Sequence, residues 1–470
     1  MKVEIANLGV IEKAEIDLKP LTVFIGGNGT GKTWTAYTLA SILGEYGCDK
    51  YSKAYIDSKT QQRYPIIDNA IEQFLQEGNT SIDLIKFAED NAEKYINDVA
   101  NLAPSWMKNF LGTERGNFEY MQVKLNLSEA KQEAIDKLRN NFSEQRIYYF
   151  DTQNKNTLQI LKESGEENVH FYITSEDKLD KIFKKLPKRI FRQLLIQVTF
   201  EILHKSFYSE IYIFPIERNA FIIFPYQVEK EINKREMIEN DDKDEISKRK
   251  SIQLSMPIHN LGNILKDAYI KPLSEREEEI QFIPQISEYI KLAKLLENDI
   301  LQGQLNIDES LAGKEILFQA TEENVKLEMT VSSSMIKELA PLVLYLRYLA
   351  EPNELLIIDE PEMNLHPAAQ VEITEFLAML VQAGLKVLIT THSPYIVDHL
   401  SNLMKAAKYE DKDSIKDRFY LERTEAFIPQ EKVSVYLFED STAKNILHEN
   451  GRIDWGTFGN VSDDISHIFP

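Results

Sequence analysis

Short apolar segments with the spacing of strands lie near the beginning of the chain and are followed by a helical pattern. Residues 3–5, 14–18 and 21–25 arrange their apolar positions as strands do, and the third segment leads directly into a glycine-rich stretch. From 33 to 43, apolar residues recur at helical spacing. This order of strand, glycine-rich loop and helix is the context that a phosphate-binding loop requires.

The last third of the chain returns to the same kind of pattern. Residues 355–358 and 387–391 are continuous apolar runs, and 368–382 between them has the pattern of a helix. Such runs are typical of strands in a buried, mostly parallel sheet with helices packed on it. The fold class is therefore predicted to be α/β, with one head assembled from both ends of the sequence.

Mainly helical, charged sequence separates these two ends, without an internal repeat of fixed period. We expect helical insertions at 46–114 and 227–312. The head is then discontinuous and consists of 1–45, 115–226 and 313–470. A chain of 470 residues is expected to form two or three structural units, because a single core rarely grows to that size.

Charge and composition narrow the class of protein further. The 75 acidic residues outnumber the 54 basic ones, and the formal charge of −21 argues against a protein that coats nucleic acid, although a local basic surface is allowed. The single cysteine, Cys48, excludes an intramolecular disulfide and a cysteine-rich zinc site. The N-terminus lacks the pattern of a secretory signal, and no apolar run approaches the roughly 20 residues that cross a bilayer. We expect a soluble, cytoplasmic protein without a membrane partner.

The strongest local signal is a phosphate-loop motif of the form Gly-x4-Gly-Lys-Thr. It consists of Gly26, Gly27, Asn28, Gly29, Thr30, Gly31, Lys32 and Thr33. Glycines allow successive backbone N–H groups to converge on a phosphate, and the following helix adds its positive dipole end. Lys32 is expected to reach the β- and γ-phosphates of ATP, and the Thr33 hydroxyl to bind Mg²⁺. A chance match is the alternative, and the strand and helix on either side of the motif argue against it.

Two acidic residues follow the apolar run at 355–358. A carboxylate at the end of a buried strand is placed to hold Mg²⁺, and we predict this role for Asp359. Glu360 comes next and is predicted to polarise the water that attacks the γ-phosphate. Taken alone, the pair could equally be an acidic turn after a core strand. The phosphate loop elsewhere in the chain favours the functional interpretation.

His392 lies just past the apolar run at 387–391. Doubly wound sheets place ligand-binding residues at this end of their strands, so His392 is predicted to hydrogen-bond the γ-phosphate. A lone histidine is more often a capping or core residue. Its position after a strand, following the Asp359–Glu360 pair, favours a catalytic role.

The three sites, in this order and with a long insertion between the first and second, resemble the ATP-binding-cassette (ABC) ATPases of the recombination and chromosome-maintenance branch. The segments Ile5-Ala6-Asn7-Leu8-Gly9, Asp359 to Pro367 and Thr391 to Pro394 are similar to those of bacterial OLD-like ATPases. The resemblance covers roughly 1–45 and 313–430. It implies an ABC-type P-loop ATPase head with helical insertions, and ATP and Mg²⁺ as cofactors.

The resemblance also implies a signature segment that binds the γ-phosphate held by a second protomer. The candidate is Ser332, Ser333 and Ser334 at the start of a predicted helix, where hydroxyls and N–H groups suit an anion. The family usually has glycine where Ser334 falls, and an ordinary serine-capped helix is the alternative. The run from Phe214 to Arg218 is similar to a strand-to-loop element of the family, which would bring Arg218 near the nucleotide. The glutamine that senses Mg²⁺ in the family is not identified.

By this resemblance, the chain is expected to be an ATP-driven switch that assembles as a homodimer or larger homo-oligomer. OLD-like ATPases commonly serve bacterial anti-phage systems, paired or fused with a nuclease. Residues 393–470 are too few for a fused TOPRIM nuclease, and Asp411-Lys412-Asp413 lacks the apolar strands that such a metal site needs. The effector, a nuclease or toxin, is therefore expected to be a separate polypeptide. A phage protein is a possible trigger.

Two other functions stay open at this point. A RecF-like DNA repair or recombination ATPase would act on DNA, and its ATPase rate would rise with duplex DNA at a stated salt concentration. The basic residues Lys178, Lys181, Lys185, Lys188 and Arg192 recur at helical spacing and could contact nucleic acid or an acidic protein. An ordinary solvated helix face is the favoured explanation of this pattern. A transporter ATPase subunit fits less well, because such subunits carry less inserted sequence.

Overall fold

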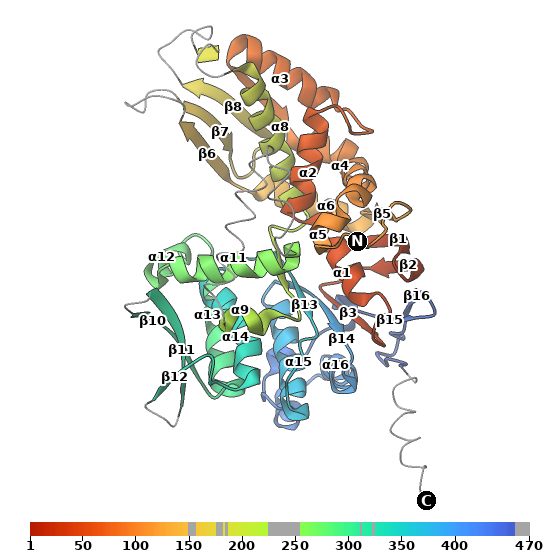
Figure 1. Ribbon diagram of the computed structural model, residues 1–470, viewed down its shortest axis with the longest axis vertical. Helices are drawn as coiled ribbons and strands as arrows, with labels where there is room; N and C mark the ends of the chain where they lie inside the picture. Colours follow the sequence, from red (N-terminus) through yellow and green to blue (C-terminus); the bar gives the residue numbers. More distant parts are fainter. Residues whose placement is uncertain are drawn as a thin grey trace, which may run out of the picture. The chain divides into compact units, whose positions relative to one another are not determined.

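The computed structural model describes residues 1–148, 157–174, 182–183, 187–223, 254–310, 313–321 and 325–455. They form two compact units (Figure 1). The smaller unit contains 1–4, 41–105 and 121–210, and the larger contains 5–40, 106–120 and the described residues from 211 onward. The sequence-based division differs from this one, because it assigns 115–226 to the head and 227–312 to an insertion.

A mostly parallel sheet forms the centre of the larger unit. From β1 onward, the strand order is β1-β2-β16-β15-β3-β14-β13-β9. β3 pairs in parallel with β14 on one side and with β15 on the other, while β13 lies in parallel between β14 and β9. The strands are β1 (Lys2–Leu8), β2 (Ile11–Asp17), β3 (Leu21–Gly26), β9 (Ile211–Phe214), β13 (Leu355–Asp359), β14 (Lys386–Thr391), β15 (Val433–Glu439) and β16 (Thr442–Asn445).

The central strands are apolar because both of their faces are covered. All residues of β3 and β13 are buried, and their side chains join one core with those of the helices α14, α15 and α16. The helices of this unit are α1 (Lys32–Leu43), α5 (Met107–Leu111), α9 (Arg218–Ile223), α11 (Met256–Ile270), α12 (Leu273–Glu279), α13 (Ile286–Leu295), α14 (Ser334–Tyr348), α15 (Pro367–Gln382) and α16 (Pro394–Ala406). Shorter helical turns are η3 (Leu296–Ile300), η4 (Asp413–Arg418), η5 (Thr424–Ala426) and η6 (Gln430–Lys432). The predicted α/β class is confirmed.

A second, antiparallel sheet in the larger unit departs from the expectation of helical sequence up to residue 312. It consists of β10 (Gly303–Ser310), β11 (Gly313–Ala320) and β12 (Lys326–Glu328), in that order (Figure 1). Leu305 and Ile307 alternate with polar residues in β10, and Ile307 lies opposite Ile316 of β11. The alternation is too short to stand out against the charged sequence around it.

The smaller unit combines helices with an antiparallel sheet. Its sheet has the order β4-β8-β7-β6, and its strand β4 lies within the mainly helical sequence expected at 46–114. The elements are α2 (Glu45–Ile56), α3 (Pro65–Glu77), α4 (Leu84–Leu102), η1 (Ala103–Ser105), α6 (Ser128–Asn140), α8 (Lys188–Lys205), β4 (Asn79–Asp83), β5 (Gln122–Asn126), β6 (Ser143–Tyr148), β7 (Thr157–Lys162) and β8 (Asn168–Thr174). Tyr51, Tyr95 and Phe200 pack their rings against one another in its core, with centroids about 5 Å apart.

The basic residues that sequence analysis placed on one helix face are only partly described. Lys178, Lys181 and Lys185 lie outside the described residues, whereas Lys188 and Arg192 lie in α8. A guanidinium nitrogen of Arg192 is 3.7 Å from Glu72. In the part of the chain that the structure describes, no helix combines the length and apolar character needed to span a membrane.

A buried histidine in the smaller unit should make stability depend on pH. His204 is 3% exposed, and burial lowers the pKa of its imidazole to about 4. The unfolded chain takes up a proton on this residue below its ordinary pKa of about 6.5, whereas the folded chain resists protonation until about pH 4. The contribution of the neutral His204 to the free energy of unfolding is complete above pH 6.5. Up to about 3 kcal/mol of it should be lost as the pH falls from 6.5 to about 4. Urea unfolding at pH 7 and pH 4.5 should show that the free energy of unfolding falls less between these pH values for His204→Gln than for the wild type. An equal fall in both proteins would contradict the assignment of this pH dependence to His204.

Candidate active site

The glycine-rich loop connects the buried strand β3 to helix α1. Gly26 lies where a Cβ atom would approach the Phe438 carbonyl oxygen to 2.4 Å, so any other residue would push β3 and β15 apart. Gly31 has a φ of +98°, and a Cβ there would meet the Ile11 side chain at 2.8 Å. The loop therefore needs glycine at both positions for reasons of backbone geometry alone.

Lys32 is the first residue of α1, and its ammonium group folds back over the loop. Its Nζ donates to the carbonyl oxygens of Gly26 and Gly27 at 2.9 and 2.8 Å. The side chain is buried, and burial lowers the pKa of Lys32, while the carboxylates of Glu360, Asp359 and Glu362 oppose this effect. A cation held over a glycine loop by backbone carbonyls can exchange these weak acceptors for phosphate oxygens.

Three hydroxyl groups surround the Asp359 carboxylate at the end of β13. Thr33 donates to Oδ1 at 3.0 Å, Tyr37 donates to Oδ2 at 3.3 Å, and Thr390 of β14 also donates to Oδ1. Burial raises the pKa of Tyr37 well above its usual value, and the negative charges of Asp359 and Glu217 add to this effect. Sequence reasoning missed Tyr37, although it lies one helical turn after Thr33 and thus on the same face of α1.

Glu360 follows Asp359 in an uncommon backbone conformation. Its φ is +49°, a region that residues with a Cβ rarely adopt, and such strain often marks a functional position. Its N–H donates to the Thr390 carbonyl at 3.0 Å, and its own carbonyl accepts from Arg218 at 2.8 Å. The backbone of Glu360 is therefore fixed from both sides.

His392, just beyond β14, lies close both to Glu360, the other predicted catalytic residue, and to Lys32 of the phosphate loop. Its Nε2 is 2.9 Å from Glu360 Oε1 and 3.3 Å from Lys32 Nζ. Its backbone N–H donates to Glu362 Oε1 at 2.7 Å, and the Thr391 hydroxyl donates to the same oxygen at 2.7 Å. Burial raises the pKa of Glu362. The structure thus brings His392, Glu360 and Lys32 together, and Glu362 is a supporting residue that sequence analysis missed.

Behind Glu360, a buried ion pair joins α9 to α14. Arg218 Nε lies 2.9 Å from Glu338 Oε2, and both side chains are almost fully buried. The same guanidinium donates to the carbonyl oxygens of Asp359 and Glu360 at 2.7 and 2.8 Å. The amide of Asn364 donates to the other Glu338 oxygen at 2.9 Å. Sequence analysis expected Arg218 near the nucleotide, and the structure shows it in contact with the backbone of Asp359 and Glu360. Its partner Glu338 was not predicted.

Ser332, Ser333 and Ser334 lie at the start of α14. The Ser333 hydroxyl accepts from the Ile336 N–H at 3.3 Å and caps the helix, and the buried Ser332 donates to the Glu328 carbonyl at 3.1 Å. Ser334 is exposed. Within the described part of the chain, no recorded hydrogen bond joins these serines to the phosphate loop. They remain a candidate signature segment for a second protomer's nucleotide.

The residues at this edge of the sheet fit ATP with Mg²⁺. The glycine loop is shaped by close backbone approaches that exclude a Cβ, and the buried Lys32 ammonium supplies positive charge. The hydroxyl of Thr33 and the carboxylate of Asp359 are the hard oxygen ligands that Mg²⁺ prefers. Within the described residues, no cluster of three or more histidine, cysteine, aspartate or glutamate side chains placed to hold a metal ion occurs.

Comparison with known proteins identifies the family of this chain. The AAA ATPase domain family matches residues 1–397, and the chain belongs to this family. The Old nuclease of Escherichia phage P2 is 28% identical over 133 residues, which are 27% of this chain and 22% of that protein. The solved structures of similar fold include the Smc head domain of Pyrococcus furiosus bound to the C-terminal domain of ScpA, with 11% identity, a TM-score of 0.35 and coverage of 99% of this chain and 98% of that one. The SMC head domain of Thermotoga maritima matches with 10% identity, a TM-score of 0.30 and coverage of 95% and 97%.

Proposed function

We propose that this protein hydrolyses ATP and uses the hydrolysis cycle to switch between assembled and separated states. The observation that carries the proposal is the position of His392, whose Nε2 lies 2.9 Å from Glu360 Oε1 and 3.3 Å from Lys32 Nζ, beside the Thr33–Asp359 pair. Membership of an ATPase family supports it. A cation, two carboxylates and a histidine beside a glycine loop suit phosphoryl transfer, which depends on positioning and charge stabilisation.

Each residue has a distinct proposed task. Lys32 would leave the loop carbonyls and bind the β- and γ-phosphates, and Thr33 with Asp359 would hold Mg²⁺. When bound, the metal ion would neutralise charge that develops on the transferred phosphoryl group. Glu360 would accept a hydrogen bond from the attacking water and orient it. His392, already 2.9 Å from Glu360, would donate to the γ-phosphate and hold the glutamate in place.

The second half of the site is proposed to come from another copy of the chain. Ser334 is exposed at the start of α14, and Ser333 leaves its backbone N–H near the positive end of the helix dipole. In an isologous dimer, each phosphate loop would face the partner's serine segment, so two ATP molecules would hold two protomers together. ATP would then favour the closed state because it binds that state more tightly.

The proposed biological role is in anti-phage defence, with a separate toxin or a nuclease of the TOPRIM type as effector and a phage protein as trigger. The limited likeness to the Old nuclease supports an association with a nuclease. The finer proposal is the ATPase subunit, AriA, of a two-gene PARIS system, in which ATPase and effector are separate chains. The alternative, a RecF-like DNA repair ATPase, predicts a rate that rises with duplex DNA.

Mixing two inactive variants tests whether the site is shared between protomers. Lys32→Ala should abolish ATP binding, and Ser334→Arg should abolish hydrolysis by blocking the close approach of the partner's nucleotide. In a heterodimer of the two, one composite site carries both substitutions and the other carries neither. An equimolar mixture should therefore recover about a quarter of the wild-type ATPase rate if the sites work independently. A Ser334→Arg variant with the normal rate would contradict the shared site.

A further inference from the structure

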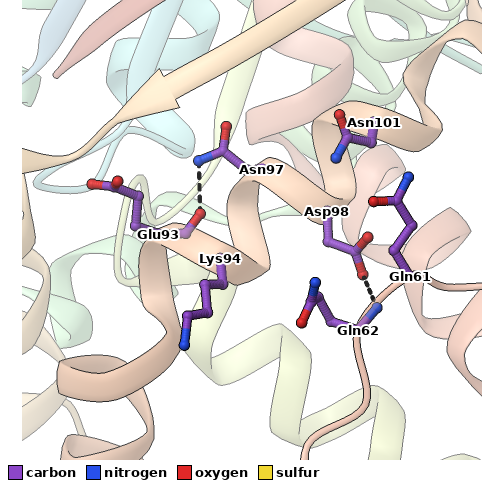
Figure 2. Close-up of a pocket in the computed structure, with 7 residues that line it drawn as sticks. All are labelled: Gln61, Gln62, Glu93, Lys94, Asn97, Asp98 and Asn101. Carbon is purple, nitrogen blue, oxygen red and sulfur yellow. Dashed lines mark hydrogen bonds between the residues drawn. The ribbon is translucent and has the colours of Figure 1, made fainter.

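A pocket in the smaller unit is lined only by residues with polar side chains, none of which belongs to the proposed ATPase site. It has a volume of about 260 Å³ and is lined by Gln61, Gln62, Glu93, Lys94, Asn97, Asp98 and Asn101 (Figure 2). Five of these residues belong to α4, spaced so that they share one face of the helix, and two belong to the turn before α3. No apolar side chain lines it, so it suits a ligand held by hydrogen bonds and charge.

Asp98 is the buried member of this set. It is 2% exposed, and its Oδ2 accepts from the Tyr51 hydroxyl at 2.9 Å and from the Gln62 N–H at 3.2 Å. Burial and the nearby Asp98 raise the pKa of Tyr51, so its hydroxyl stays protonated and keeps this bond. The other oxygen, Oδ1, is buried without a hydrogen-bond partner among the described residues. An unpaired buried carboxylate oxygen is costly, and a donor that enters the pocket would satisfy it.

The pocket lacks a cation that is fixed against Asp98. Lys94 lines it but is exposed, and among the described residues it forms no recorded ion pair. Arg63 in the neighbouring turn is already held by Asp68 at 2.6 Å and by the Tyr55 carbonyl at 2.7 Å. Glu93 and Asp98 together outweigh Lys94, so the lining carries one net negative charge. Buried charges in folded proteins are normally paired, which points to a positively charged ligand.

The rim of the pocket favours a planar group with several donors. Gln61, Gln62 and Asn101 are exposed, and no recorded hydrogen bond occupies their side-chain amides in the described structure (Figure 2). These amides can turn aside to admit a ligand and then offer carbonyl oxygens to it. A guanidinium carries five N–H donors in a rigid fork and no acceptor, which suits a carboxylate floor with an amide rim better than a single ammonium does.

A second depression adjoins the first and would hold the chain that carries this group. It has a volume of about 450 Å³, shares Gln62 and Lys94 with the first pocket, and follows α4 past Asn91 and Asp90 to Phe87. A free amino acid would need only the first pocket. The pair of depressions instead offers room for the backbone that extends from a side chain.

We propose that the polar pocket binds an arginine side chain of a partner polypeptide, with the guanidinium on Asp98 and its neighbouring backbone along α4. The binding site is independent of nucleotide, and it stands whether or not the chain hydrolyses ATP. It makes the smaller unit a recognition module for a segment of a protein that exposes arginine.

A pair of capped tripeptides tests the charge requirement on the full-length protein. Ala-Arg-Ala and Ala-citrulline-Ala have side chains of nearly the same shape, but citrulline is neutral. Saturation-transfer NMR should show binding of the arginine peptide in the millimolar range, about tenfold tighter than the citrulline peptide. Asp98→Asn keeps an acceptor for Tyr51 and Gln62, and it should remove this preference. Asp136→Asn changes an exposed carboxylate on α6 outside both depressions and should bind as the wild type does.

Loss of fold is controlled with a second variant at the rim. Gln61→Ala/Asn101→Ala alters two exposed side chains, so its thermal transition should match that of the wild type while binding of the arginine peptide weakens several-fold. The proposal is overturned by equal binding of the two peptides, by a preference for arginine that persists in Asp98→Asn, or by absence of binding to the folded wild type in the millimolar range.

Discussion

Glu360→Gln is expected to reduce the ATPase rate by about 10²- to 10⁴-fold while ATP still binds. The carboxylate of Glu360 lies 2.9 Å from His392, and its backbone is held by Thr390 and Arg218, so the side chain is aimed before any substrate arrives. Glutamine has nearly the same shape and can keep a contact with His392. It cannot accept a proton from water, so hydrolysis should fail without loss of the phosphate site.

The same variant should accumulate an assembled state in the presence of ATP and Mg²⁺. Light scattering after size-exclusion chromatography would detect it, and a phosphate-release assay would give the rate. Glu410→Gln, at an exposed position of the larger unit, is the matched control and should behave as the wild type. A normal hydrolysis rate in Glu360→Gln would show that another group orients the water.

Sequence reasoning locates this site because strand ends follow a simple rule. In a parallel sheet, the carboxyl ends of neighbouring strands meet at one edge, and β14 lies between β3 and β13. Residues that follow three apolar runs must then converge, even though more than 300 positions separate Lys32 from His392. The glycine motif, Asp359, Glu360 and His392 could be predicted because each is marked by its position after such a run.

The supporting residues could not be predicted in the same way. Glu338 lies in the middle of an amphipathic helix, where a glutamate usually faces solvent, and only the packing of α14 against α9 brings it to Arg218. Strand β4 of the smaller unit was not predicted for a related reason. β4 has the sequence Asn-Thr-Ser-Ile-Asp, whose strand pattern is too short and polar to detect, and it is ordered by pairing with β8, which starts at Asn168. The position of Glu338 and the formation of β4 both depend on contacts with residues that are distant in the sequence.

The buried Arg218–Glu338 pair yields the second large expected effect. Arg218→Ala should lower the free energy of unfolding by about 3–5 kcal/mol, because it leaves the Glu338 carboxylate buried without its cation. The ATPase rate should also fall, since the carbonyls of Asp359 and Glu360 lose their shared donor. Urea unfolding and ATPase assays on the same preparation would measure both, but alone they could not separate a catalytic effect from loss of fold.

A double variant separates the two effects. In Arg218→Met/Glu338→Gln, neither member of the pair carries a charge, and the glutamine oxygen can still accept from Asn219 and Asn364. Most of the lost stability should return, because a neutral, hydrogen-bonded arrangement replaces the unpaired ion. The backbone anchor for Glu360 is still missing. A displacement of about 1 Å at a catalytic group can cost about 10²-fold, so kcat should stay about 10²-fold low with little change in KM for ATP.

This outcome would make Arg218 a positioning residue that acts through the backbone of Glu360. Because Glu338 belongs to α14, the helix whose first turn carries Ser334, any displacement of that helix would also reach the catalytic glutamate through Arg218. If the stable double variant hydrolysed ATP at the wild-type rate, the positive φ of Glu360 and its bonds to Thr390 would suffice to position the residue. The ion pair would then serve stability alone, and contact with a second protomer would need another route to the water-activating carboxylate.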